Sequence, residues 1–503
     1  MSEILFGQSY YLRFDPKLWK AMQPYPPLGT MIAASYLREI GYDVALFDAM
    51  LAESEDEWAA ALDKGQPLYA IIYEDNFNYL SKMCLLRMRD AAFAMIEMAK
   101  ARGCTVIVCG SDANDHLGAY LAHGADFILL GEGEHTLGEL MGSLNGMGPE
   151  LSEILGLAYM RDGRVVSNPR RPDIKDIDSL PFPAWDLVDV QRYREIWKKR
   201  HGYFSMNMVT TRGCPFHCNW CAKPIWGQRY NARTPENVVA EMRWLKETYQ
   251  PDHIWFVDDI MGLKPGWMAR FAELVEQEDA RIPFKSLNRA DLLLKDGEIE
   301  ALKRAGCQIT WIGAESGSQK ILDAMEKGTK VEQIYAAARR LHEAGLKVGF
   351  FLQFGYPGES LEDIDKTLQM VRDCKPDDIG MSVSYPLPGT KFYNAVKEQM
   401  GVKQNWTNSS DLAMMYNGPF GTEFYRQLHT TLHREYRARK TWRQVTNGDA
   451  LNAKKWLSLA NNAARLPIER RRLRRLARHP HMGILLQPPA GDPAAATEPT
   501  PQE

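Results

Sequence analysis

The sequence lacks the features that would direct the chain into a membrane or out of the cell. It contains no run of about 18 apolar residues, which a transmembrane helix requires. It does not begin with a basic segment followed by an apolar stretch, so no secretory leader is predicted. The formal net charge of -3 argues against a general nucleic-acid binder. We therefore expect a soluble cytoplasmic protein with no nucleic-acid partner.

Extended disorder is also missing from most of the chain. Hydrophobic residues make up 45% and charged residues 25%, which are ordinary values for globular proteins. At 503 residues the chain exceeds one ordinary core, so two or three domains are expected. Only residues 486–503, which are rich in Pro, Ala and Thr, are predicted to be disordered.

Cysteine is scarce, and only three of the eight cysteines have the spacing of metal ligands. Cys214, Cys218 and Cys221 form a CxxxCxxC loop. Three thiolates on one loop can hold three irons of a [4Fe-4S] cluster and leave the fourth iron open for chemistry. The remaining cysteines are scattered, and we expect them to be small buried or half-buried residues: Cys84, Cys104, Cys109, Cys307 and Cys374.

Two other uses of this cysteine loop stay open. A structural zinc ion needs a fourth ligand, and His217 is the only nearby candidate. It directly precedes Cys218, so the two side chains would converge on one tetrahedral ion with difficulty. A disulfide with a spare thiol would need an oxidising compartment. Metal analysis of anaerobically purified protein separates the iron cluster from zinc.

Residues 1–145 alternate short apolar runs with helical patterns, which predicts a doubly wound, Rossmann-like parallel sheet. The expected strands are 4–6, 44–47, 68–73, 106–109 and 127–130. Ligands of such sheets bind outside the carboxyl ends of the strands. Small residues occupy several of these ends, and we single them out as candidates: Pro27, Gly29, Gly110, Ser111, Gly131 and Gly133.

The second half of the chain predicts a different α/β unit. Residues 146–200 should form a hairpin around Asp162-Gly163 and a proline-rich linker. Six strand–helix units in 201–400 predict a partial (β/α)6 barrel of the TIM type, with its site at the carboxyl ends of the strands. Residues 401–485 should be helical. The cysteine loop follows the first barrel strand, and further candidates follow later strands: Asp258, Asp259, Glu315, Ser316, Gly355 and Gly358.

The barrel motifs resemble those of radical S-adenosylmethionine (SAM) enzymes. The likeness rests on the cysteine spacing, the preceding Arg212-Gly213 and the aromatic Trp220 before the third cysteine. In that family the open iron chelates SAM, and one electron from the cluster cleaves it to a 5′-deoxyadenosyl radical. The resemblance implies that the strand-end candidates of the barrel contact SAM. The alternative for each is an ordinary solvated strand end or tight turn.

The first domain resembles the cobalamin-binding Rossmann domain found before many radical SAM barrels. The likeness rests on Pro-Pro-Leu-Gly at 26–29, Asp48-Ala49, Cys-Gly-Ser at 109–111 and Gly-Glu-Gly-Glu at 131–134. It implies that the small residues at these strand ends contact cobalamin. The signature DxHxxG is absent, so cobalamin would bind without a histidine from that loop. A Rossmann-like domain that has lost its ligand is the alternative.

Residues 411–426 add a short likeness to the anaerobic magnesium-protoporphyrin IX monomethyl ester cyclase group. The combined resemblance implies a small-molecule substrate, tetrapyrrole or lipid-like, whose unactivated carbon is methylated, cyclised or oxidised. It also implies an electron donor such as flavodoxin or ferredoxin. The alternatives are a cobalamin-free radical SAM enzyme and a methylthiotransferase-like RNA modifier. The RNA modifier would carry a second cluster, so about eight rather than about four irons per chain.

A basic helix is expected near the end of the chain. Residues 465–478 contain seven arginines with leucines between them. Such a helix suits peripheral contact with an anionic membrane surface or with RNA, and it also occurs as a solvated helix.

Overall fold

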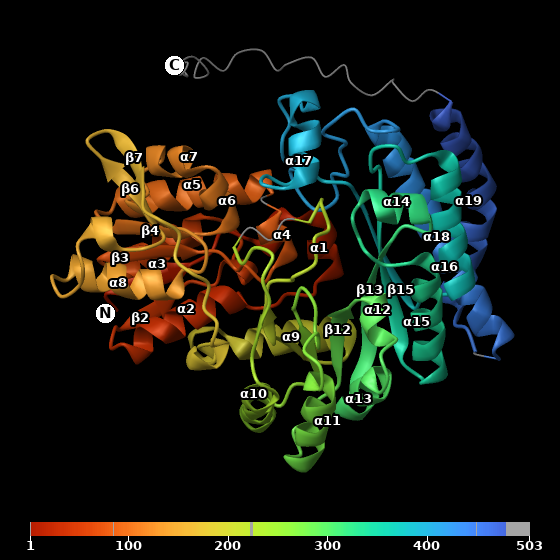
Figure 1. The fold of residues 1–503 in the computed structure, drawn as a ribbon, viewed down its shortest axis with the longest axis horizontal. Coiled ribbons are helices and arrows are strands. Elements are labelled where there is room, and N and C mark those ends of the chain that lie inside the picture. The colour runs from red at the N-terminus through yellow and green to blue at the C-terminus, as the bar shows by residue number, and fades with distance from the viewer. Residues whose placement is uncertain (1, 84, 222–224, 449, 479–503) are drawn as a thin grey trace.

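The computed structural model describes residues 2–83, 85–221, 225–448 and 450–478 (Figure 1). The predicted disordered tail, 486–503, and Cys84, for which burial is expected, lie outside these residues. Within the described ranges no helix combines the length and the apolar character needed to cross a membrane. Cys104, Cys109, Cys307 and Cys374 are buried, as the sequence predicts.

The first sheet has the strand order β2-β1-β3-β4-β5-β6-β7, and its first five strands are parallel. All five predicted strands are present. The bounds are β1 Ile4–Gly7, β2 Val44–Leu46, β3 Tyr69–Tyr73, β4 Thr105–Cys109 and β5 Phe127–Leu129. The helices are α1 Pro16–Ala21, α2 Leu28–Glu39, α3 Asp56–Gly65, α4 Tyr79–Lys82, α5 Leu86–Lys100, α6 Ser111–Asp115, α7 Leu117–Ala122 and α8 Glu134–Leu144.

Helices cover both faces of this sheet, which explains its continuous apolar strands. Alternate residues of one strand enter two different cores: Ile72 packs with α3 and α5, whereas Ile71 packs with α2 and α8. The hairpin of β6 (Leu157–Arg161) and β7 (Arg164–Ser167) is expected in the connecting segment. It instead extends the first sheet as two antiparallel strands beyond β5.

The second sheet has six parallel strands in the order β15-β14-β13-β12-β11-β8. Their bounds are β8 Ser205–Met208, β11 His253–Phe256, β12 Phe284–Asn288, β13 Cys307–Glu315, β14 Lys347–Phe354 and β15 Asp378–Val383. The covering helices are α10 Pro235–Thr248, α11 Trp267–Gln277, α12 Ala290–Leu293, α13 Glu298–Ala305, α14 Gln319–Ala324, α15 Val331–Glu343 and α16 Leu361–Cys374. Helix α10 is N-capped by Thr234, whose Oγ1 accepts a hydrogen bond from Asn237 N at 3.2 Å.

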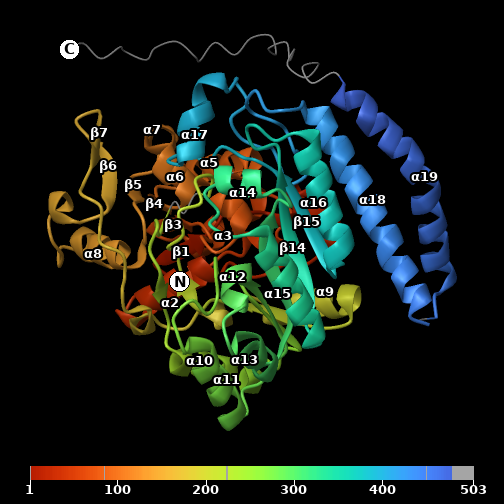
Figure 2. The ribbon, with the colours of Figure 1, turned by 45° about the vertical axis from the view of Figure 1, so that its right-hand side comes forward.

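Three helices beyond the barrel form the C-terminal region: α17 Lys391–Val396, α18 Thr422–Thr446 and α19 Ala453–Ala477. Figure 2 shows α18 and α19 side by side, with α18 next to α16 and α19 outermost. The aromatic segment before and within α18 packs into the core, since Phe420, Phe424 and Tyr425 are buried. The helical C-terminal region is therefore present as predicted.

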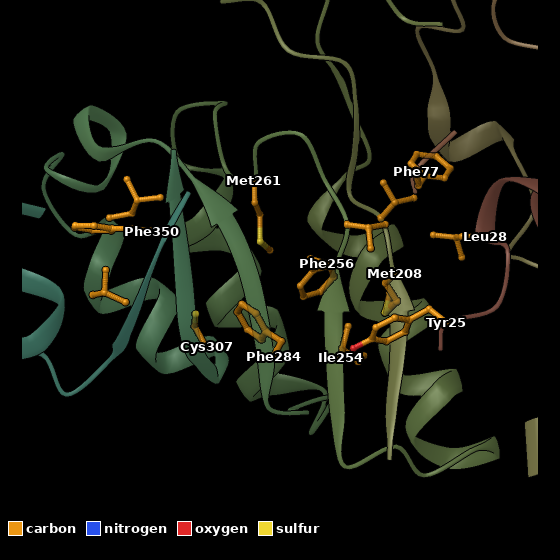
Figure 3. Packing of buried hydrophobic residues seen from close by; sticks show 14 of the residues in the cluster. Tyr25, Leu28, Phe77, Met208, Ile254, Phe256, Met261, Phe284, Cys307 and Phe350 are labelled. Atoms are coloured by element: carbon orange, nitrogen blue, oxygen red, sulfur yellow. The ribbon is translucent and has the colours of Figure 1, made fainter. Parts of the chain in front are cut away.

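The two sheets are joined through a shared core (Figure 3). Tyr25, from the loop after α1, lies against Trp197 and Trp255, with ring centroids 5.1 and 4.9 Å apart. Its hydroxyl is 2.9 Å from Ser205 Oγ on β8. Trp197 belongs to α9 (Val190–His201), and its indole donates to Pro24 O at 2.7 Å. The carboxyl edge of the first sheet is thereby fixed against the barrel.

Candidate functional site

The cysteine loop begins directly after β9 (Thr211–Arg212), a short strand that pairs with β10 (Asn231–Ala232). At its start Gly213 has φ = +78°, and a Cβ there would lie 2.4 Å from Arg229 O, so only glycine fits. All three thiols of the loop are half-buried. They do not converge, because no group of three or more His, Cys, Asp or Glu among the described residues has metal-binding geometry.

Asn219 anchors the middle of this loop to the barrel. Its backbone N–H donates to Met325 O at 3.0 Å, and its side-chain amide donates to Ala324 O at 2.8 Å. The Tyr356 hydroxyl donates to its Oδ1 at 2.9 Å, and Phe392 N–H donates to its carbonyl at 3.0 Å. Four hydrogen bonds from three separate segments fix this residue in place.

Aromatic side chains hold the loop on either side of Asn219. The Arg289 guanidinium, at the carboxyl end of β12, lies 3.6 Å from the centre of the Phe216 ring. Arg289 is itself buried and donates to Lys327 O and Thr329 Oγ1, both at 3.0 Å. Trp220 packs against the apolar cluster of α14, and its buried Nε1 has no acceptor among the residues described.

Glu315 ends β13 in an unusual conformation. Its φ is +55°, a value that L-residues avoid, and the pairing with β14 shifts register between Gly313 and Glu315. The carboxylate is buried and accepts from Lys327 Nζ at 2.9 Å. Burial lowers the pKa of Lys327, but Glu315 and the Cys218 thiol raise it above its ordinary value. Lys327 thus pairs with the predicted SAM-binding carboxylate, and its carbonyl accepts from Arg289, which contacts Phe216 of the cysteine loop.

The two aspartates after β11 have different partners. Asp258 is buried and accepts three short hydrogen bonds, from Thr210 N, Thr210 Oγ1 and Thr211 N, at 2.7 to 2.8 Å. These bonds set the turn that leads into β9. Burial raises the pKa of Asp258 to about 6. Asp259 instead accepts from Lys82 Nζ of the first domain at 2.7 Å.

The remaining barrel candidates lie in tight turns. Gly355 has φ = +83°, donates to Glu359 Oε2 at 2.6 Å and accepts from the Tyr416 hydroxyl. Burial raises the pKa of Glu359 to about 8. Gly358 has φ = +81°, and its carbonyl accepts a hydrogen bond from Lys320 Nζ at 2.7 Å. Ser316 is buried with its Oγ 3.1 Å from Thr367 Oγ1.

Arg212, the residue before Gly213, joins the cysteine loop to the first domain. Its guanidinium is 2.9 Å from Glu132 Oε1 and 2.7 Å from Glu134 Oε1, and all three side chains are about 3% exposed. Burial alone raises the pKa of Glu134, but Arg212 lowers it below its ordinary value. The segment 131–134 is therefore a buried ionic contact with the barrel.

The predicted cobalamin contacts lie at the carboxyl edge of the first sheet. Pro27 is the N-cap of α2, and Gly29 N–H donates to Asp75 Oδ1 at 3.0 Å. Ser111 Oγ donates to Ser81 O at 3.3 Å. The glycines pack against protein atoms: a Cβ would lie 2.7 Å from Glu74 Cγ at Gly110, 3.4 Å from Arg170 Nε at Gly131 and 2.7 Å from Tyr73 Cε2 at Gly133.

The same edge carries buried hydroxyls that form no hydrogen bond with any residue that the structure describes. Ser9 Oγ and Tyr10 Oη follow β1, and Ser81 Oγ lies in α4 after β3. Buried hydroxyls normally form hydrogen bonds, so such groups suit a ligand or ordered water. They were not predicted, because a lone serine or tyrosine after a strand is too common to stand out.

The segment after β3 forms a second contact with the barrel. Phe77 stacks on Trp226 with ring centroids 5.0 Å apart, and Lys82 Nζ lies 4.7 Å from the centre of the Trp226 rings. Trp226 follows the cysteine loop in the chain, just as Arg212 precedes it. Both flanks of the loop are therefore held by strand-end residues of the first sheet. Neither contact was predicted from the sequence.

The barrel matches a known protein family. Residues 208–371 match the family model described as the radical SAM superfamily. The chain therefore contains a radical SAM domain, and the resemblance drawn from the cysteine loop is confirmed.

Relatives and a solved structure extend the likeness beyond this domain. An uncharacterized methyltransferase of Pyrococcus horikoshii is 30% identical, across 56% of this chain and 60% of its own length. The anaerobic magnesium-protoporphyrin IX monomethyl ester cyclase of Synechocystis is 26% identical, across 56% of each. This chain thus spans less than two thirds of either relative.

The solved structure of OxsB, described as a cobalamin-dependent SAM radical enzyme with aqua-cobalamin bound, superposes with a TM-score of 0.71. The superposition covers 94% of this chain and 72% of that one, at 17% identity. It confirms the predicted fold class: a doubly wound sheet, a partial β/α barrel and a helical C-terminal region.

Proposed function

We propose that this chain is a cobalamin-dependent radical SAM enzyme that methylates, cyclises or oxidises an unactivated carbon of a small molecule. When bound, the [4Fe-4S] cluster would supply the electron that cleaves SAM to a 5′-deoxyadenosyl radical, and cobalamin would carry a methyl group or an electron. The observation that carries the proposal is the position of the cysteine loop. The loop lies at the carboxyl ends of the barrel strands and is held on both flanks by the carboxyl edge of the first sheet.

The donor set of the loop fits an iron–sulfur cluster. Cys214, Cys218 and Cys221 would hold three irons, and their half-buried thiols share one short segment. The loop would draw the thiols together around the cluster. Asn219 and the Phe216–Arg289 contact would orient the segment. His217 would not be a ligand.

Glu315 is the strongest candidate for contact with SAM among the barrel residues. Its strained backbone aims a buried carboxylate at the edge that carries the cysteine loop, and its ion pair with Lys327 links it to the Cys218 region. Ser316, Gly355 and Gly358 would shape the adjoining turns. Asp259 would act together with Lys82, whereas the three hydrogen bonds of Asp258 give it a supporting role.

Cobalamin would contact the carboxyl edge of the first sheet. The unpartnered hydroxyls of Ser9, Tyr10 and Ser81 offer polar groups there. Pro27, Gly29, Gly110, Ser111, Gly131 and Gly133 would line the surrounding backbone. The substrate class, tetrapyrrole or lipid-like, is proposed from the sequence resemblance, and the likeness to the Synechocystis cyclase supports a tetrapyrrole. An electron donor such as flavodoxin or ferredoxin and a cytoplasmic location stay predictions.

Anaerobic reconstitution of two cysteine variants tests the cluster. Cys218→Ala should lose most of the cluster absorbance and release no 5′-deoxyadenosine under a strong reductant. Cys374→Ala removes a buried thiol from α16 and should behave as the wild type. A Cys218→Ala protein with the full cluster and full SAM cleavage would contradict the proposal, and so would wild-type protein that contains zinc and no iron.

Purification with hydroxocobalamin tests the second cofactor. We expect the desalted protein to keep a corrinoid band in its visible spectrum. Loss of that band, with SAM cleavage intact, would favour the cobalamin-free alternative. About eight irons per chain would instead favour a methylthiotransferase-like enzyme with a second cluster.

A further inference from the structure

One face of α19 is accounted for by its contacts with α18. Glu469 accepts from Gln427 Nε2 at 2.8 Å and lies 3.3 Å from Arg434 Nε. Arg470 reaches Glu435 at 2.8 Å. Asn462 is buried on the same side. These residues leave the opposite face of the helix turned away from the protein, as the outermost position of α19 in Figure 2 shows.

The outward face is apolar over the first half of the helix. Trp456, Leu457 and Ile468 are 47%, 72% and 68% exposed. Ala460 and Ala464 follow Trp456 at intervals of four, so they lie on the same face. Trp442 of α18, which is 56% exposed, also lies close to the turn between the two helices. Exposed tryptophans at the tip of a helical hairpin are typical of contact with the headgroup region of a bilayer.

The second half of the same face is basic. Residues 466–478 contain six arginines and a single acidic residue, Glu469, and of these Glu469 and Arg470 are paired with residues of α18. The chain as a whole has a net charge of -3, so this positive charge is local. Exposed arginines continue the helix beyond Ile468: Arg471, Arg472, Arg474, Arg475 and Arg478.

We propose that the outward face of α19 docks on an anionic lipid bilayer. The helix would lie in the plane of the surface, with Trp456, Leu457 and Ile468 buried among the headgroups and the arginines against lipid phosphates. Each basic side chain near such a surface contributes about 1 kcal/mol. Charge complementarity alone also fits RNA, but exposed Leu and Ile gain nothing from a phosphate backbone. A lipid surface accommodates both halves of the face.

Vesicle co-sedimentation of the full chain tests this proposal without cluster, SAM or cobalamin. The protein should sediment with vesicles of phosphatidylcholine and phosphatidylglycerol, and high salt should weaken that binding. Vesicles of phosphatidylcholine alone should bind the protein at least about tenfold more weakly. Equal binding to both vesicle types, or no binding to either, would overturn the proposal.

Two variants and a matched control assign the binding to α19. Replacing four arginines with glutamine (R471Q, R474Q, R475Q and R478Q together) should weaken binding by about tenfold or more. W456S combined with L457S and I468S should weaken it while leaving the charge unchanged. The control variant removes the same amount of charge from exposed residues of β6, β7 and α9 by combining R161Q, R164Q, K198Q and K199Q. It should bind vesicles as the wild type does.

Circular dichroism of each variant checks that the fold is kept. An equal loss of vesicle binding in the control variant would mean that the net charge of the protein explains the binding. That result would contradict a docking face on α19. Two other results would also overturn the proposal. One is a dimer in light scattering that the W456S, L457S and I468S variant abolishes. The other is RNA binding that is tighter than vesicle binding and is lost in the same arginine variant.

Discussion

At the carboxyl edge of the barrel, Glu315 forms an ion pair with Lys327 and adopts a strained backbone conformation. At the carboxyl edge of the first sheet, Glu132 and Glu134 share Arg212 and hold the barrel in place. Both edges bear polar residues at strand ends, where ligands of parallel sheets bind. The carboxylates of the first edge neutralise an arginine that positions the cysteine loop, whereas Glu315 pairs with a lysine of its own domain.

The comparison shows that a strand-end residue can serve a ligand or a neighbouring domain. Gly133 illustrates the second use, because a side chain there would collide with Tyr73 and Cys109 before it met any ligand. The hydroxyls of Ser9 and Ser81, by contrast, have no hydrogen-bond partner within the described part of the chain. Ligand contacts at the first sheet are therefore expected from side chains that sequence patterns do not single out.

Arg212→Ala should lower the free energy of unfolding the most, because it removes the ionic contact between the first sheet and the barrel. It leaves two buried carboxylates without their cation, and losing one member of a buried ionic group costs about 3–5 kcal/mol. We expect a correspondingly lower midpoint in thermal and urea unfolding. Arg38→Ala is the control: it removes an exposed ion pair between α2 and Asp186, worth less than about 1 kcal/mol. An equal loss of stability in the two variants would show that the buried ionic group stabilises the fold no more than the exposed ion pair does.

The sequence predicted the elements of both edges well. Parallel strands covered on both faces give continuous apolar runs such as 69–73 and 105–109, so their positions could be read directly. The cysteine loop could be identified because its three thiols lie within eight residues. Features of this kind depend on neighbours in the sequence, and one sequence is enough to show them.

The contacts between the edges could not be predicted. Arg212 is 80 residues from Glu132, and Lys82 is 177 residues from Asp259. Neither local periodicity nor composition carries information about such pairs. The hairpin of β6 and β7 was recognised from Asp162-Gly163, but its pairing with β5 depends on an open strand edge that only the fold reveals. The ligand roles of the candidate residues stay predictions for the same reason.

Glu74→Gln should change the pH dependence of stability at the first edge. Glu74 is buried after β3, with both carboxylate oxygens 3.2 Å from Ser9 N, and burial raises its pKa to about 7. An acid whose pKa is higher in the folded state loses stability as pH rises, here from about 4.5 to about 7. At 1.36 kcal/mol per pKa unit, the loss is on the order of 3 kcal/mol. The glutamine variant should not show it.

Urea unfolding across this pH range measures the difference. The free energy of unfolding of Glu74→Gln relative to wild type should increase with pH and level off above about pH 7. Glu150→Gln removes the same charge from an exposed position after α8 and should run parallel to the wild type. A constant offset between Glu74→Gln and wild type would mean that folding does not shift the pKa of Glu74.

Loss of the contact between Arg289 and Phe216, at the barrel edge, should change the free energy of unfolding the least. A double-mutant cycle with Arg289→Lys and Phe216→Leu isolates the coupling between the two side chains. For a partly buried cation–π contact we expect about 1 kcal/mol in the unfolding free energy. The cycle is needed because Arg289 also donates to Lys327 O and Thr329 Oγ1. Arg289→Lys loses these two hydrogen bonds with and without Phe216→Leu, so their contribution cancels in the coupling energy. Additive effects would mean that the contact between Arg289 and Phe216 does not help to hold the cysteine loop, and its position would then depend on Asn219 and on the contacts of its two flanks.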